Sequence, residues 1–160
     1  FIKIYRNQGV SFMSYTGECH CGNVKFKTEL KPMLVVQCNC TSCRRLTGIM
    51  GVRAMYSSDE VTWSGAISEY VYQGGSGGNL YTQHCPNCHT NVYATLDYME
   101  GMTSIPIGMF DNPEVIKPWL EIWTDSKLDW VKDNGCVTNS VPDSGVQERL
   151  VEVLESLENR

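Results

Sequence analysis

Seven of the eight cysteines in this 160-residue chain fall into three tight clusters, which carry the strongest chemical signal in the sequence. The clusters are Cys19-His20-Cys21, Cys38-Asn39-Cys40-Thr41-Ser42-Cys43 and Cys85-Pro86-Asn87-Cys88. A disulfide needs a narrow geometry of its Cα atoms and Cβ vectors, so two cysteines separated by one residue are poorly placed to bridge each other. Short cysteine spacings of this kind are typical of metal sites. The clusters therefore predict metal ligation.

A secreted scaffold held by disulfides is the alternative use of so many cysteines. It is disfavoured because residues 1–12 mix charged and polar residues with apolar ones and contain no continuous apolar stretch of the kind found in signal peptides. We expect residues 1–14 to be an N-terminal extension and the protein to be cytoplasmic.

The cysteines divide most naturally into a group of four and a group of three. Structural zinc commonly takes four ligands, as two short pairs brought together from distant chain segments. Seven cysteines cannot complete two such sites. The run from Cys38 to Cys43 is local enough to surround one ion by itself, whereas the remaining two pairs would close a site that ties the first strand to a hairpin in the middle of the chain. That second group is Cys19, Cys21, Cys85 and Cys88.

The two groups have different chemical consequences. A closed site of four thiolates has no room for a substrate and contributes folding free energy. A site formed by Cys38, Cys40 and Cys43 leaves a fourth position open, as catalytic zinc requires. Zinc accepts soft sulfur ligands, so such a site suits a thiol substrate. The alternative is that both sites are structural and a side chain fills the fourth position, the candidates being His20, His84, His89 and Cys136.

Composition and charge narrow the class of protein further. The chain is 42% hydrophobic and 19% charged, within the range of ordinary globular domains. Its net charge of −5 disfavours nonspecific binding to nucleic acid. The longest aliphatic run, residues 33–36, is far shorter than the roughly 20 apolar residues that span a bilayer, so we expect no membrane partner. Residues 1–96 nevertheless carry eight basic and five acidic residues, an excess that favours a small anionic ligand.

The elements that must position the cysteines are mostly β-strands. Residues 24–30 alternate with period two, and residues 33–38 read as a buried strand that ends in the second cluster. Further short strands are predicted at residues 51–56, 69–72, 80–84, 91–95 and 102–108. The glycine-rich residues 74–79 lack the Gly-Lys-Ser/Thr ending of a phosphate-binding loop, so we interpret them as the tip of a hairpin.

One helix is predicted near the C-terminus, after Pro142, with Asp143 or Ser144 as its cap. Its apolar residues recur at helical spacing and are expected to pack on the sheet: Val146, Leu150, Val153, Leu154 and Leu157. Its polar residues are expected to face the solvent: Glu148, Arg149, Glu152, Glu155 and Glu158.

Residues 17–26, followed by the run from Cys38 to Gly48, resemble the opening of the glutathione-dependent formaldehyde-activating enzyme family, also called the CENP-V/Gfa domain. The pair Cys85 and Cys88 is similar to that family's third cluster, and residues 121–130 are similar to its closing strand and tryptophan. The family commonly has a glycine after the third cluster, where this chain has His89, and such turns often require a positive φ. The resemblance covers residues 15–131, which we expect to be the zinc-binding domain, with residues 132–160 forming a loop and an amphipathic helix packed on it.

The resemblance implies a mainly β, Mss4-like fold of twisted antiparallel sheets pinned by two zinc ions, here followed by the C-terminal helix. It assigns Cys19, Cys21, Cys85 and Cys88 to a structural ion and Cys38, Cys40 and Cys43 to a catalytic one. The activity it implies is condensation of formaldehyde with glutathione to S-(hydroxymethyl)glutathione, classed as a carbon–sulfur lyase for the reverse reaction.

Two functions follow as hypotheses. The first is an enzyme whose partners are glutathione or a similar thiol and a small aldehyde, with Arg44 and Arg45 pairing with carboxylates of the thiol. These arginines are equally compatible with surface salt bridges or with contacts to backbone carbonyls near the cysteine loop. The second is a zinc-pinned module that binds a protein partner without catalysis, with an anchor among Trp63, Trp119, Trp123 and Trp130. Assembly into a homo-oligomer is compatible with both.

Overall fold

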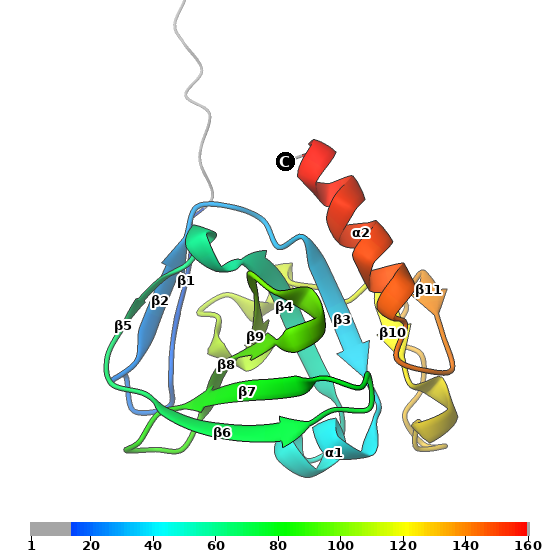
Figure 1. Ribbon diagram of the computed structural model, residues 1–160, viewed down its shortest axis with the longest axis horizontal. Helices are drawn as coiled ribbons and strands as arrows, with labels where there is room; N and C mark the ends of the chain where they lie inside the picture. Colours follow the sequence, from blue (N-terminus) through cyan, green and yellow to red (C-terminus); the bar gives the residue numbers. More distant parts are fainter. Residues whose placement is uncertain (1–13, 160) are drawn as a thin grey trace, which may run out of the picture.

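The computed structural model describes residues 14–159, so the predicted N-terminal extension lies outside the described residues except for Ser14. Two sheets form the body of the protein (Figure 1). The smaller contains, in spatial order, β1 (Tyr15–Glu18), β2 (Lys25–Thr28) and β5 (Thr62–Ser64). The larger contains, in spatial order, β11 (Asn139–Ser140), β10 (Leu120–Ile122), β3 (Leu34–Cys38), β4 (Gly51–Ser57), β9 (Met102–Pro106), β8 (Asn91–Leu96), β7 (Asn79–His84) and β6 (Ser68–Gln73).

Within residues 14–159, two α-helices accompany the sheets. The short α1 (Thr41–Thr47) follows β3 directly, and α2 (Val146–Asn159) lies beside β3 and β10 near the C-terminus (Figure 1). Five single turns of 3-10 helix connect other elements: Ser58–Glu60, Asp97–Met99, Ile107–Met109, Pro113–Val115 and Thr124–Ser126. Among the described residues, no helix combines the length and the apolar character needed to cross a membrane.

The strand β3 is buried along its whole length because side chains pack on both of its faces. On one face Val35 joins Phe26, Tyr56 and other residues in the core between the two sheets. On the other face Leu34 and Val36 pack with residues of β10 and α2, including Val153. Successive side chains of a strand point to opposite faces, so β3 connects the two halves of the core.

The predicted fold class, mainly β with a C-terminal helix, is confirmed. All seven predicted strands are present, with ends that differ by a few residues, and residues 74–79 form the tip of the β6–β7 hairpin. The sheet differs from the expected antiparallel arrangement at one edge, where β10 runs parallel to both β3 and β11. The short elements β1, β5, β11 and α1 were not predicted, because none contains enough apolar residues to show a period.

The orientation predicted for the C-terminal helix is confirmed for Val153, which is buried, and wrong for its leucines and for Arg149. Its most buried residues are Arg149 and Val153, whereas Leu150, Leu154 and Leu157 are 40%, 61% and 56% exposed. The helix therefore packs through a face that includes an arginine, because the guanidinium finds hydrogen-bond partners beneath the helix.

Candidate metal centres and the adjoining pocket

The four-cysteine cluster brings together two loops that are distant in the chain. Cys19 and Cys21 lie in the β1–β2 connection, and Cys85 and Cys88 lie in the β7–β8 connection. The Sγ atoms of Cys19 and Cys21 are 3.6 Å apart, and those of Cys21 and Cys85 are 3.7 Å apart. Four sulfurs at about 2.3 Å from a tetrahedral zinc ion lie about 3.8 Å from one another. The donor set and its spacing therefore fit a tetrahedral ion.

Backbone geometry holds these sulfurs in place. The backbone N–H of Val24 donates to Cys19 Sγ at 3.3 Å, and Cys88 Sγ lies 3.2 Å from the Thr90 hydroxyl. Beyond Cys88 the chain turns through His89, whose φ of 59° lies in the left-handed region that favours glycine. The positive φ expected where the family commonly has glycine is thus present, adopted here by a histidine.

The three-cysteine cluster is built within a single connection. Cys38 ends β3, and Cys40 and Cys43 flank the first turn of α1, with the three sulfurs within 4.8 Å of one another. Cys40 Sγ also caps the helix by accepting the Cys43 backbone N–H at 3.3 Å. Gly51, paired with Cys38 across the sheet, leaves room for the cluster, because a Cβ there would lie 3.3 Å from Cys43 Sγ.

A buried carboxylate anchors the loop that carries these cysteines. Asn39, between two of the ligand positions, donates through Nδ2 to Glu121 Oε1 at 3.0 Å and to the Ile122 carbonyl at 3.2 Å. Gln37 Nε2 donates to the same carboxylate at 2.7 Å, and Lys127 Nζ lies 2.9 Å from it. Burial opposes ionisation of Glu121, but hydrogen bonds from Lys127 and Asn39 outweigh it and lower the pKa of the carboxyl.

The thiols of the three-cysteine cluster titrate as a group that shares charge. Hydrogen bonds from Cys38 and Cys43 lower the pKa of Cys40 to about 2. Hydrogen bonds to Cys40 and Cys43, together with burial, raise the pKa of Cys38. One thiolate is therefore readily accommodated here, whereas three need a compensating positive charge. A thiophilic divalent cation supplies that charge, so this cluster also fits a metal ion.

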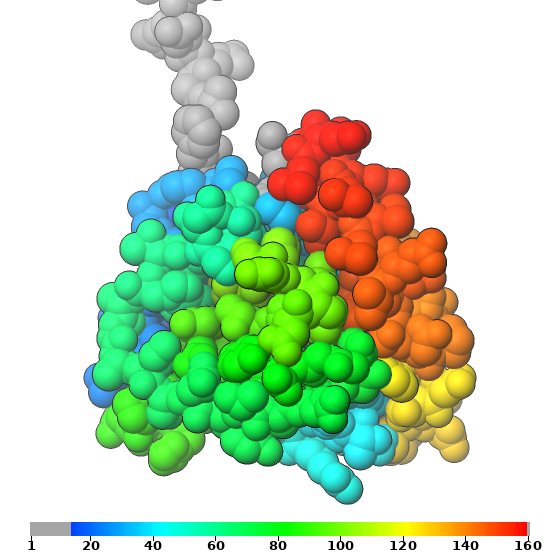
Figure 2. All heavy atoms as spheres, in the orientation of Figure 1, coloured from blue at the N-terminus to red at the C-terminus, as the bar shows by residue number. Residues whose placement is uncertain are grey.

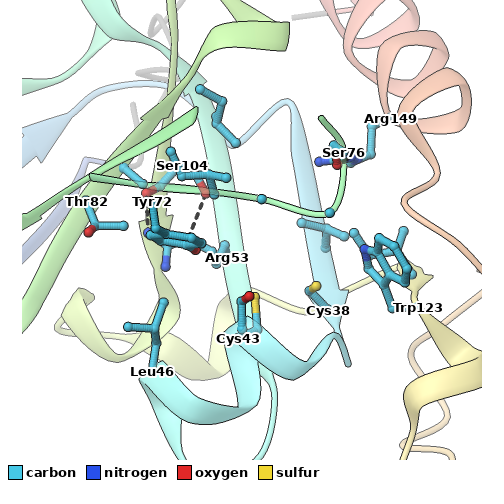
Figure 3. A pocket seen from close by; sticks show the side chains of 18 of the residues that line it. Cys38, Cys43, Leu46, Arg53, Tyr72, Ser76, Thr82, Ser104, Trp123 and Arg149 are labelled. Carbon is cyan, nitrogen blue, oxygen red and sulfur yellow. Dashed lines mark hydrogen bonds between the residues drawn. The ribbon is translucent and has the colours of Figure 1, made fainter. Parts of the chain in front are cut away.

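A pocket of about 70 Å³ adjoins the three-cysteine cluster and is lined by Cys38 and Cys43 but not by any cysteine of the four-cysteine cluster. Its walls come from β3, α1, β4, the β6–β7 hairpin and α2. In Figure 2 the green atoms of the β6–β7 hairpin adjoin the orange atoms at the start of α2 and the cyan atoms of α1. Figure 3 shows the two cysteines between Arg53 and Tyr72 on one side and Arg149, Ser76 and Trp123 on the other.

Two aromatic residues shape the pocket. Trp123 has a φ of 59° and lies against Gly75, where an added Cβ would come within 2.7 Å of the indole. This close approach requires glycine at position 75.

The second aromatic residue is Tyr72. Burial, reinforced by the nearby charge of Cys43, raises the pKa of Tyr72, so its hydroxyl remains protonated at neutral pH.

The pocket arginines are Arg53 and Arg149, not the two that the sequence indicated. Arg44 donates to the Ser126 carbonyl at 3.2 Å, and neither Arg44 nor the exposed Arg45 lines the pocket. Their contact with a carboxylate stays a prediction. Arg53 was missed because a single arginine in a predicted strand carries no signal, and Arg149 because the helical pattern placed it in solvent.

The other residues singled out from the sequence lie apart from the three-cysteine cluster. Within residues 14–159, no histidine or carboxylate joins its three sulfurs as a further ligand, and Cys136 belongs to neither cluster. Trp63 packs on Phe26 and Tyr93, Trp119 borders the core and donates to Glu152 Oε2 at 2.8 Å, and Trp130 is 63% exposed.

The fold and the two clusters together define a mainly β protein of Mss4-like type with two cysteine sites able to hold metal ions. The sequence model of the glutathione-dependent formaldehyde-activating enzyme family matches residues 14–126, and the chain belongs to this family.

Comparison with solved structures finds a Rhodobacter sphaeroides protein from structural genomics, 18% identical, with a TM-score of 0.46. The match covers 79% of this chain and 99% of that one. A search of curated proteins gives no match.

Proposed function

We propose that this protein is a zinc-dependent carbon–sulfur lyase that forms and cleaves the S-hydroxymethyl adduct of glutathione or a similar thiol with formaldehyde. The proposal is supported by family membership and by one observation above all. Of the two cysteine clusters, the three-cysteine cluster borders a pocket, and no further side-chain ligand completes it among the described residues.

Cys19, Cys21, Cys85 and Cys88 would hold a structural zinc ion, and Cys38, Cys40 and Cys43 would hold the catalytic one. Bound at the second site, zinc would supply a position for the substrate thiol and favour its thiolate form. The protein's part is to keep three sulfurs on one side of the pocket and to exclude a fourth ligand of its own.

In the synthetic direction the thiol sulfur adds to the carbonyl carbon of formaldehyde. A carbon–sulfur bond forms, the carbonyl oxygen gains the proton lost by the thiol, and the product is the S-hydroxymethyl thiol; cleavage reverses each change. Tyr72 is a candidate to hydrogen-bond this oxygen, because its side chain lines the pocket and burial raises its pKa, so the hydroxyl keeps its proton to donate. Removing one such donor typically costs about a hundredfold in rate.

The test follows the exchange of ¹³C-formaldehyde with its glutathione adduct by NMR exchange spectroscopy, with and without the metal-loaded protein. We expect catalytic amounts of protein to accelerate the exchange, and Tyr72→Phe to reduce that acceleration. In parallel, glutathione should change the thiolate-to-metal absorption of the cobalt-substituted protein. A protein that holds two inert ions and leaves the exchange at its spontaneous rate would instead be a binding module.

A further inference from the structure

Arg149 is a buried cation without an acidic partner. Arg149 is 4% exposed, and no carboxylate within residues 14–159 forms an ion pair with its guanidinium. Its partners are neutral: Nε donates to the Gly145 carbonyl at 3.3 Å, Nη1 to the Tyr98 hydroxyl at 2.9 Å and Nη2 to Ser76 Oγ at 3.1 Å. Burial of an unpaired charge is costly, so this arrangement favours a site at which an anion is supplied from outside.

The guanidinium is held in a fixed orientation at the edge of the pocket. The Tyr98 ring lies beneath it, with its centroid 5.0 Å from Cζ, and the Gly145 carbonyl belongs to the residue just before α2. An arginine has five N–H donors, and the three hydrogen bonds above leave two of them for a ligand. Two parallel N–H groups are what a carboxylate accepts.

Arg53, the other pocket arginine, lies on the opposite flank (Figure 3). Three of its five N–H groups are used within the sheet, because its Nε donates to Ser104 Oγ and its Nη2 to the Ser104 carbonyl and Asn91 Oδ1. Arg149 is thus the arginine on the α2 side of the pocket.

From these contacts we propose that Arg149 binds the carboxylate of the thiol substrate, so that α2 selects thiols that are also carboxylic acids. This rests on the proposed function and adds a residue outside the segment, residues 14–126, that matches the family. The pocket volume of about 70 Å³ corresponds to roughly five to seven waters. It therefore holds the sulfur and the acidic end of a ligand, with the rest of a larger thiol outside.

The experiment compares 3-mercaptopropionate with the neutral 3-mercapto-1-propanol, by calorimetry and by the absorption of the cobalt-substituted protein. We expect the wild type to prefer the acid by roughly ten- to a hundredfold, as for a charged hydrogen bond. Arg149→Gln should abolish the preference while changing the dissociation constant of the neutral thiol less than about twofold. Lys117→Gln, which removes an exposed cation outside this pocket, should retain the preference.

Several results would overturn the proposal. They are a wild type without preference, an Arg149→Gln variant that keeps it, and equal loss of both ligands in that variant, which would indicate a structural role only. Loss of the preference in Arg44→Gln or Arg45→Gln alone would assign the carboxylate to those arginines. If Arg149→Gln does not fold, Arg149→Lys, which keeps the charge but loses the paired donors, should weaken the acid and spare the alcohol.

The proposed function can fail separately. If neither thiol changes the cobalt spectrum, the site does not bind thiols, and plain propionate then tests Arg149 alone. Calorimetric binding of propionate to the wild type and not to Arg149→Gln would support the carboxylate site. Absence of propionate binding would refute it.

Discussion

The two cysteine clusters use the same ligand chemistry but are connected in opposite ways. In the four-cysteine cluster, Cys21 and Cys85 are 64 positions apart, and the cluster joins the loop between strands of the small sheet to a hairpin of the large one. In the three-cysteine cluster all ligands lie between positions 38 and 43. Closing a long loop removes chain entropy from the unfolded state, so the four-cysteine cluster is suited to hold the fold together. The three-cysteine cluster closes only a short loop, so one of its ligand positions can stay open.

The surroundings of the two clusters also differ, since one lies partly in the core and the other beside a pocket. Cys19 and Cys85 are 1% and 0% exposed and lie within the core between the sheets. The three-cysteine cluster borders a pocket and owes its position to side chains of a distant strand, chiefly Glu121. A metal site built within one loop therefore depends on contacts from outside that loop to keep its ligands in place beside an open pocket.

The largest effect is expected from breaking the four-cysteine cluster. Cys85→Ser removes one ligand from a site at which bound zinc would itself contribute folding free energy, of the order of 10 kcal/mol for structural zinc. We expect an insoluble protein, or one without a cooperative thermal transition. Calorimetry checks this, and an unchanged melting temperature would show that the roles of the two clusters are assigned wrongly.

The matched change in the other cluster should separate folding from chemistry. Cys43→Ala leaves the four-cysteine cluster intact and the helix cap in place, since the cap uses the Cys43 backbone N–H. We expect a folded protein that binds one zinc ion instead of two and no longer accelerates adduct exchange. Cys136→Ala is the control, and elemental analysis should still find two ions; loss of one would identify Cys136 as a ligand.

A smaller effect is expected at the support of the three-cysteine loop. Glu121→Gln removes charged hydrogen bonds with Lys127 and Asn39, and should lower the free energy of unfolding by about 1.5–3 kcal/mol. Glu29→Gln is the matched control, because its ion pair with Lys27 is half exposed and should contribute less than about 1 kcal/mol.

The ionised Glu121 carboxylate also predicts that the free energy of unfolding depends on pH. The pKa of Glu121 is lowered in the folded protein, so its ionised form stabilises the fold. That contribution is complete above the ordinary value of 4.5 and is lost as the pH falls through the folded pKa. Urea unfolding should therefore show the largest difference between the wild type and Glu121→Gln at neutral pH, and a difference that shrinks below pH 4.5. A difference independent of pH would contradict the assignment of charge.

How far the sequence predicts the structure depends on the range of the interaction. The cysteine groups and the strands follow from spacing and alternation, which are local signals. The placement of α2 does not, because it depends on hydrogen bonds from Arg149 to Ser76 and Tyr98, which lie 73 and 51 positions away. A helical pattern identifies an apolar face, but the partner surface decides which face is buried, and here it offers hydroxyls.

The smallest effect concerns backbone strain beside the four-cysteine cluster. His89 is exposed, and its φ of 59° costs a side chain roughly 1 kcal/mol or more relative to glycine. His89→Gly removes that strain but increases the entropy of the unfolded chain, which offsets part of the gain. We expect a net stabilisation of about 0.5 kcal/mol by urea unfolding, with the metal content unchanged. His89→Ala keeps the strain and should leave stability the same, so equal stability of both variants would show that the turn carries no strain.

The corresponding residue beside the pocket, Trp123, shares the same φ, but Trp123→Gly would also remove the indole that packs on Gly75. We therefore expect Trp123→Gly to destabilise the protein. The strain at Trp123 is offset by the packing of its side chain beside the pocket, whereas the strain at His89 is not.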